Sequence, residues 1–290
     1  MKRIAPAAAI LFLIACRHEP PFDRAAYEKD VMQWRQHRAA RLQSEDSWLS
    51  LVGLDWLHEG SNELKLPGGP AGTVVLQNGK TTLEPSRDSG LTIDGKPVAG
   101  PVDLLNDFDP KGPTVVKRSS AQFQIIKRDP RYAVRVKDAQ SDARLHFKGL
   151  EYFPIDPKWR IVAKFEPYNP PKKVPITNVL GMTGDEVSPG ALVFTVDGKE
   201  YRIDPINEQG EEDLFIIIKD QTSRDATYPA GRYLYAKHPG PDGTTIVDFN
   251  KAYNPPCTFT PFATCPLPPK QNILPFRIEV GEKRYAGGHH

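Results

Sequence analysis

The segment Asp248–Pro269 constrains the fold of this 290-residue chain more than any other stretch. It contains six prolines, four aromatic residues and two of the three cysteines. Proline fixes φ and lacks a backbone N–H, so the segment cannot form a regular helix or a central strand. Aromatic residues are scarce in disordered segments. We therefore predict an ordered, extended loop. It either presents side chains to a ligand or covers one end of a β-sandwich.

Cysteine placement predicts how this loop is held. Cys257 and Cys265 are separated by seven residues. A disulfide between them would close a short loop and contribute about 2–3 kcal/mol. Such a bond forms in an oxidising compartment. Two free buried thiols remain the alternative.

The first sixteen residues are typical of a bacterial lipoprotein signal. Lys2 and Arg3 precede a short apolar run that ends Leu13-Ile14-Ala15-Cys16. That run is too short to span a bilayer and fits a signal peptide over residues 1–15. The sequence thus predicts lipidation of Cys16, a tether over residues 16–22 and membrane attachment through the lipid. An ordinary cleaved signal is the alternative.

Lipidation would place the protein in the bacterial cell envelope. Arg17 rather than aspartate follows Cys16, which favours the periplasmic face of the outer membrane if the cell is Gram-negative. Removing residues 1–15 leaves 36 basic and 36 acidic residues. A near-neutral chain without a basic stripe predicts no nucleic-acid partner.

Residue patterns divide the remaining chain. Residues 23–46 predict an N-terminal helix, in which Asp23 is the N-cap and Arg24–Gln43 lacks glycine and proline. Residues 47–150 predict a first β unit and residues 151–285 a second β unit that carries the disulfide loop. Residues 286–290 form a tail. The fold class is mainly β: a helix followed by one or two antiparallel β-sandwich or barrel-like units.

Local signals within the β units are specific. Asn78-Gly79, Asp94-Gly95 and Asp197-Gly198 predict tight hairpin turns. The continuous apolar run Leu214–Ile218 predicts a strand buried on both faces. Ile273–Val280 predicts a final strand. Trp48 and Trp56 are interpreted as core side chains rather than as a ligand platform.

Candidate site residues come from two segments of the second unit. Consecutive antiparallel strands usually pair, so both segments are expected at one end of the unit, beneath the cysteine loop. An arginine, carboxylates, amides and aromatics there suit a small polar, carboxylated or glycan ligand. They equally suit a structural network. The candidates are Asp220, Thr222, Tyr228, Arg232, Asp248, Asn250, Tyr253 and Asn254.

With these segments laid out, the chain resembles DUF1684, a bacterial and archaeal family of unknown function. The matching stretches include Ser47–Gly60, Phe147–Arg160, Asp220–Tyr235 and Asp248–Asn272. The resemblance extends from about Trp34 to Tyr285. It implies a domain extent and no activity or catalytic residues.

Two functions therefore stay open. The favoured one is a lipid-anchored envelope protein that binds a ligand or serves a structural or assembly role. The alternative is an envelope hydrolase or lyase that acts on glycan or peptide with Asp220 or Asp248 as acid or base. The sequence has no G-x-S-x-G nucleophile motif and no metal-ligand spacing. Neither a cofactor nor a metal site is expected.

Overall fold

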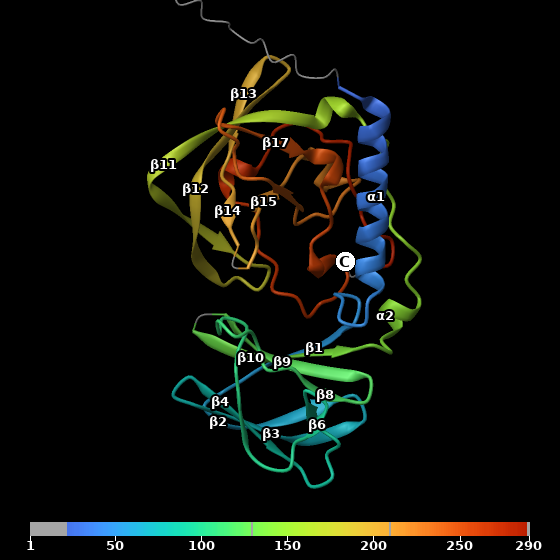
Figure 1. The fold of residues 1–290 in the computed structure, drawn as a ribbon, viewed down its shortest axis with the longest axis vertical. Helices are drawn as coiled ribbons and strands as arrows, with labels where there is room; N and C mark the ends of the chain where they lie inside the picture. Colours follow the sequence, from blue (N-terminus) through green and yellow to red (C-terminus); the bar gives the residue numbers. More distant parts are fainter. Residues whose placement is uncertain (1–21, 129, 209, 289–290) are drawn as a thin grey trace, which may run out of the picture.

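The computed structural model describes residues 22–128, 130–208 and 210–288. The predicted signal peptide and lipidated Cys16 lie outside these residues. Two β units are stacked along the long axis of the molecule, and the long helix α1 lies along the side of the second unit (Figure 1). Within the described part of the chain, no helix has the length and apolar character needed to cross a membrane.

The first unit is an antiparallel β-sandwich. A six-stranded sheet has the order β1-β10-β9-β8-β5-β6 and a four-stranded sheet the order β2-β3-β4-β7. One apolar cluster, which includes Leu64, Val74, Phe123 and Val134, fills the space between them. The strands are β1 Leu51–Trp56, β2 Gly60–Leu66, β3 Gly69–Gln77, β4 Lys80–Pro85, β5 Thr92–Ile93, β6 Lys96–Pro97, β7 Val102–Leu104, β8 Val116–Arg118, β9 Ala121–Arg128 and β10 Arg131–Asp138.

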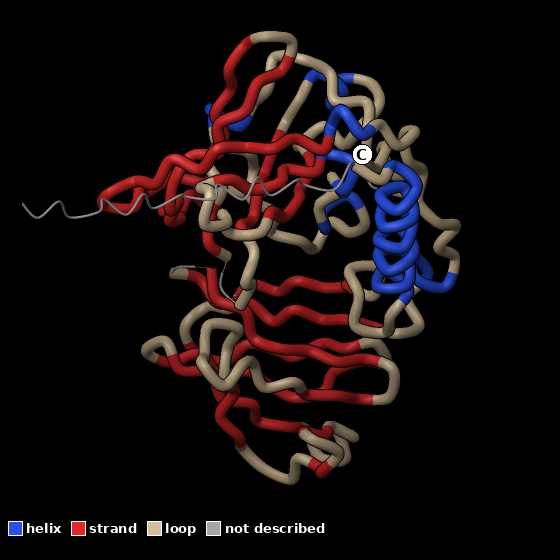
Figure 2. The backbone as a smooth tube through the Cα atoms, turned by 45° about the horizontal axis from the view of Figure 1, so that its top comes forward, coloured by secondary structure: helices blue, strands red, loops and turns tan. Residues whose placement is uncertain are grey.

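The second unit has its own apolar cluster, so the two units do not share one core. A four-stranded sheet β13-β12-β11-β17 packs near a three-stranded sheet β14-β15-β16. In Figure 2 the second unit and the helix lie in the upper part of the view, and the stacked strands of the first unit lie below them. The strands are β11 Arg160–Thr177, β12 Thr183–Val196, β13 Lys199–Ile203, β14 Ile206–Asn207, β15 Leu214–Ile218, β16 Arg232–Ala236 and β17 Thr244–Asp248.

Helices are few in the described residues. They are α1 Arg24–Gln43, the short α2 Asp142–Leu145 and the 3₁₀ turns η1 Pro157–Trp159, η2 Gln221–Arg224, η3 Phe249–Lys251, η4 Pro256–Thr258 and η5 Lys270–Asn272. The predicted N-cap of α1 is confirmed, because the Asp23 carboxylate accepts a hydrogen bond from the Ala26 N–H at 3.0 Å. Tyr27 and Val31 are buried, and the helix packs on the second unit rather than the first.

The predicted hairpin turns are present. Asn78, Asp94 and Asp197 each have a φ near +50°, and the glycine that follows each has a φ near +75°. Two successive residues with positive φ are typical of the type I′ turns that join twisted antiparallel strands. These turns connect β3 to β4, β5 to β6 and β12 to β13.

Strand β15 is buried along its whole length, as the apolar run predicts. Its alternate side chains enter different clusters. Leu214, Ile216 and Ile218 face the main core of the second unit, whereas Phe215 and Ile217 face a second cluster that contains both cysteines of the loop. The strand therefore separates the core from the region beneath the loop.

The predicted final strand at Ile273–Val280 is wrong. The segment is irregular. It makes an isolated bridge to Lys219 at Ile273, and beyond it several backbone groups bond to side chains. The Ile278 N–H donates to the Asp220 carboxylate at 2.6 Å, and the Ile278 and Val280 carbonyls accept from Arg232. Apolar alternation predicts burial here but does not reveal these side-chain partners.

After Asp248, which ends β17, the loop through Pro269 contains no α-helix and no named strand, as its prolines require. It is less extended than predicted, since η3 and η4 form 3₁₀ turns within it. Pro256 begins η4, where a missing N–H has no intrahelical acceptor to lose.

Candidate functional site

The eight candidate residues are divided among internal networks. Asp220, Thr222 and Arg232 form the first of these. The Arg232 side chain is 1% exposed and that of Asp220 is 2% exposed. The Asp220 carboxylate accepts from the Thr222 hydroxyl at 2.7 Å and from Arg232 at 3.4 Å. Arg232 also donates to the carbonyls of Val280 and Ile278. This network fixes the C-terminal segment against β16.

Asp248 and Asn250 form a second network near the N-terminal end of α1. The Asp248 carboxylate accepts from the Tyr27 hydroxyl at 2.8 Å and from the Asn250 N–H at 3.1 Å. Burial is the main reason that the Tyr27 pKa lies well above its ordinary value, followed by the negative charge of Asp248. The Asn250 side chain exchanges two hydrogen bonds with the backbone of Asp156. This network attaches the helix to the second unit.

Asn254 belongs to a third network, centred on Glu282. The Glu282 carboxylate is fully buried and accepts from the Asn254 backbone N–H at 2.7 Å and from its side-chain amide at 3.0 Å. Arg38 of α1 donates to the same carboxylate at 3.0 Å. The Arg38 guanidinium also lies 4.6 Å from the centre of the Tyr253 ring. The Tyr228 hydroxyl donates to the Cys257 carbonyl at 3.3 Å.

The predicted Cys257–Cys265 disulfide is not present; both cysteines are free and buried thiols. The Cys257 N–H donates to the Cys265 sulfur at 2.9 Å. A hydrogen bond from the Cys265 thiol lowers the Cys257 pKa, while burial raises the Cys265 pKa well above its usual range. Loop spacing predicts proximity, which the structure has, but it cannot determine oxidation state.

A pocket of about 350 Å³ lies where the two units meet beneath this loop. Of the eight candidate residues, only Tyr253 lines it. Its aromatic wall consists of Trp48, Phe215, Tyr233, Tyr235 and Tyr253. The loop contributes Cys265 and four neighbouring lining residues, Pro256, Ala263, Thr264 and Pro266.

The aromatic wall forms because every second side chain of a β-strand lies on the same face of the sheet. Phe215 on β15 and Tyr233 and Tyr235 on β16 share the face opposite the main core. The Tyr235 and Tyr253 rings are nearly parallel, with centres 6.3 Å apart and an interplanar angle of 16°. Burial is the principal cause that raises the pKa of both tyrosines well above their ordinary value. Both hydroxyls are therefore neutral at physiological pH.

Three arginines line the pocket, and two of them are neutralised by acids. Arg38 pairs with Glu282 at 3.0 Å. Arg128 pairs with Asp107 at 2.7 Å and also donates to Thr264. Arg38 thus joins α1 to the C-terminal segment, and the hydrogen bond from Arg128 to Thr264 joins the first unit to the loop.

The third arginine, Arg135, is different. It is 7% exposed. Among the described residues, its guanidinium has no hydrogen-bond or ion-pair partner, and its Nε atom is buried without an acceptor. The guanidinium lies over the Trp48 ring, whose centre is 5.5 Å away. Burial, reinforced by the charge of Arg128, lowers the Arg135 pKa to about 10. Arg135 is therefore a buried cation at neutral pH.

Two glutamates line the same pocket from the segment between β14 and β15. The Glu208 carboxylate accepts from the Tyr235 hydroxyl at 2.6 Å. Desolvation by burial raises the Glu208 pKa. Glu211 lies nearby, with its N–H bonded to the Glu208 carbonyl at 3.2 Å. In the described part of the chain, neither glutamate forms an ion pair with a basic residue.

Sequence reasoning missed Arg135, Glu208 and the role of Trp48. Arg135 lies between Val134 and Val136, as a solvent-facing residue of a half-buried strand would. In the structure it is buried against Trp48 and lines the pocket between the two units. Trp48 packs against the buried cluster of Leu42, Leu49 and Phe259, as predicted, and it also lines the pocket.

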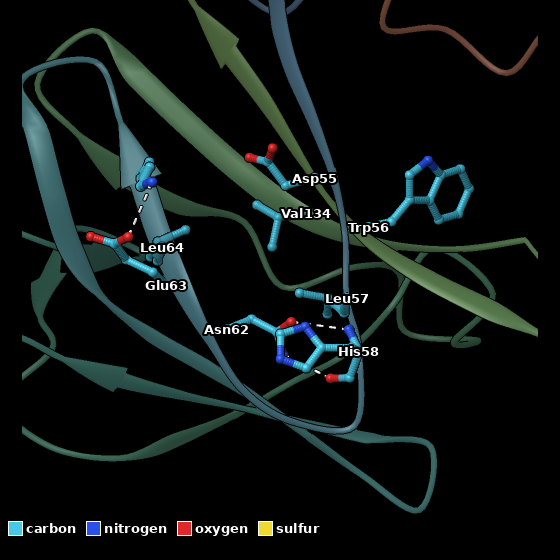
Figure 3. A pocket seen from close by; sticks show the side chains of 9 residues that line it. Asp55, Trp56, Leu57, His58, Asn62, Glu63, Leu64 and Val134 are labelled. Atoms are coloured by element: carbon cyan, nitrogen blue, oxygen red, sulfur yellow. Dashed lines mark hydrogen bonds and ion pairs between the residues drawn. The ribbon is translucent and has the colours of Figure 1, made fainter.

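A smaller hollow of about 220 Å³ lies in the first unit around Trp56, His58 and Asn62 (Figure 3). Its polar groups serve the local turn: the Asn62 side chain accepts from the His58 N–H at 3.0 Å and donates to the His58 carbonyl at 2.8 Å. Glu63 is paired with Lys65 at 3.1 Å. No described cluster of three or more His, Cys, Asp or Glu residues is arranged to hold a metal ion.

Comparison with known proteins finds a family model that matches part of the chain. Residues 145–283 match the family model DUF1684, described as a protein of unknown function. A solution NMR structure of an uncharacterised protein from Haloarcula marismortui is similar, with 29% sequence identity and a TM-score of 0.40. That similarity covers 48% of this chain and 78% of the other. No curated protein matches the chain.

Proposed function

We propose that this chain is a ligand-binding protein whose pocket between the two β units takes a small molecule with a carboxylate or phosphate group. The supporting observation is Arg135, a buried guanidinium without an acid to neutralise it. Burying a cation without a partner is unfavourable. A carboxylate or phosphate would neutralise the charge, because its oxygens can accept two parallel hydrogen bonds from the guanidinium.

The walls suit such a ligand. Five aromatic side chains offer flat apolar surface, and neutral tyrosine hydroxyls offer hydrogen bonds. Small-molecule sites are usually apolar cavities with few convergent polar groups, at volumes from about 300 Å³ upward. Asp220 and Asp248 are both buried and engaged in internal networks, so we assign them no chemistry.

Replacing Arg135 with methionine separates binding from stability. The Arg135→Met variant is expected to lose at least tenfold in affinity for benzoate, because charge-assisted hydrogen bonds contribute about 1.5–3 kcal/mol. The same variant is expected to unfold at an equal or higher urea concentration, since a buried unpaired charge is replaced by an apolar side chain. Calorimetric titration with benzoate and urea denaturation measure the two effects.

Arg131→Met is the matched control. Arg131 is exposed on the same strand and stacks on Trp56, with its guanidinium 4.0 Å from the ring centre, away from the pocket. Its replacement should leave benzoate binding unchanged. Benzyl alcohol, which lacks the anion, should bind wild type weakly. Equal benzoate affinity in wild type and Arg135→Met would remove the basis of the proposal.

We further propose that the protein is anchored in the bacterial envelope through a lipid on Cys16. The motif Leu13-Ile14-Ala15-Cys16 supports this location. A pocket on an anchored protein would meet ligands in the envelope compartment.

In that oxidising compartment, Cys257 and Cys265 are proposed to form a disulfide. The Cys257 N–H lies 2.9 Å from the Cys265 sulfur, so the two residues are already close together, which supports this reaction. The two thiols would lose two protons and two electrons, and an external disulfide would be reduced to two thiols. The bond would rigidify the loop that forms one wall of the pocket.

One mass measurement tests both modifications. Protein extracted from membranes should carry an acylated N-terminal cysteine and lack residues 1–15. It should resist alkylation at Cys257 and Cys265 until a reductant is added. A Cys16→Ala variant should leave the membrane fraction with its disulfide intact. Full alkylation without reductant would contradict the disulfide, and an unacylated N-terminus would contradict the anchor.

A further inference from the structure

The pocket contains unneutralised charges of both signs. Arg135 comes from β10 of the first unit, whereas Glu208 and Glu211 come from the β14–β15 connection of the second. In the described residues no ion pair joins Arg135 to either glutamate. By contrast, Arg38 and Arg128 on the same walls are each paired with an acid. The protein thus neutralises some pocket charges internally and leaves others for a ligand.

These charges differ in depth. Arg135 is 7% exposed and lies against Trp48. Glu208 and Glu211 are the more exposed lining residues and are placed at the mouth, although the pocket wall desolvates part of the Glu208 carboxylate. The Tyr235 hydroxyl holds the Glu208 carboxylate at 2.6 Å, and the Tyr235 ring is stacked with Tyr253. A positive group is therefore deep, negative groups are at the mouth, and stacked aromatic rings belong to the wall.

We infer that the ligand is a dipolar small molecule, with an anionic group at Arg135, a flat or ring-containing middle against the tyrosines, and an ammonium group at Glu208 and Glu211. This inference rests on the proposed function, because it assumes that Arg135 receives an anion. It adds the second charge and the orientation: the ligand enters with its anionic end first.

Complementary charge explains why both ends are needed. An anion alone would satisfy Arg135 but leave the glutamates at the mouth repelling it. A cation alone would satisfy the glutamates but leave Arg135 buried and unpaired. A dipolar ligand satisfies both ends at once, and like-charge juxtaposition weakens the binding of ligands of either single sign.

Two probes of the same ring and length test this inference. 4-(Aminomethyl)benzoate carries both charges, and 4-(hydroxymethyl)benzoate carries the anion with a neutral group in place of the ammonium. Calorimetric titration at pH 7 on the wild-type chain should give at least tenfold tighter binding for the aminomethyl compound. A Glu208→Gln/Glu211→Gln double variant should bind both compounds with similar affinity.

Glu212→Gln is the matched control, because Glu212 lies in the same connection and is not part of the pocket wall. It should keep the wild-type preference. Equal affinity of wild type for the two probes would overturn the dipolar inference and leave the anion proposal standing. Absence of binding by both probes and by benzoate would overturn both. A preference that persists in the double variant would assign the ammonium to another group and contradict the role of the glutamates.

Discussion

The Asp220→Ala variant is expected to be about 3–5 kcal/mol less stable than wild type, because it leaves the Arg232 guanidinium buried without its counter-charge. Asp220 also accepts hydrogen bonds from Thr222 and from the Ile278 N–H. Its removal would therefore release the C-terminal segment as well as the charge. Urea denaturation followed by tryptophan fluorescence measures the loss.

Asp225→Ala provides the comparison. Asp225 pairs with Arg277 at 3.1 Å on the surface, only five residues from Asp220. Exposed pairs contribute little to stability, so this variant should unfold close to wild type. A similar midpoint for the two variants would contradict the structural role assigned to Asp220.

The second large effect is expected at Glu282. In Glu282→Gln, one carboxylate oxygen becomes an NH₂ group that cannot accept hydrogen bonds from Asn254 or Arg38. The fully buried site would lose a charge that Arg38 needs, with an expected cost of about 3–5 kcal/mol. Since Arg38 belongs to α1, the C-terminal half of that helix should lose protection from amide hydrogen exchange.

Hydrogen exchange distinguishes this mechanism from a general loss of stability. Strands β9 and β10 of the first unit do not contact Glu282 and should keep their protection at low denaturant. Glu279→Gln, an exposed change near the same segment that removes a contact to Arg277, should leave α1 protected. Uniform loss of protection over both units would contradict a local role for Glu282.

Features set by neighbouring residues were predictable from the sequence. The helix Arg24–Gln43 and the Asn-Gly and Asp-Gly turns depend on capping and φ preferences that a few residues determine. The burial of β15 follows from its uninterrupted apolar run. These predictions required no knowledge of the partner strands.

The site was harder to predict because its geometry is non-local. The sequence predicts that the polar residues around Asp220 and Asp248 meet at one end of the second unit beneath the cysteine loop. Their side chains instead bond to Ile278, Tyr27 and Asp156 in separate networks. None of those partners has a sequence signal. Arg135 lines a pocket whose opposite wall comes from a different unit, and no periodicity distinguishes it from an arginine in water.

The division of the pocket between two units has a consequence for modular use of this chain. Residues 145–283, which match the family model, include the stacked tyrosines, the rim glutamates and the loop. Arg38, Trp48, Arg128 and Arg135 all lie outside that range. A protein that had only the matched region would keep an aromatic surface with two glutamates at its edge, which is called the shelf here. The residues before 145 supply the arginines of the pocket. Replacing that preceding unit would therefore reverse the charge of the ligand that the shelf binds, without altering a residue of the shelf itself.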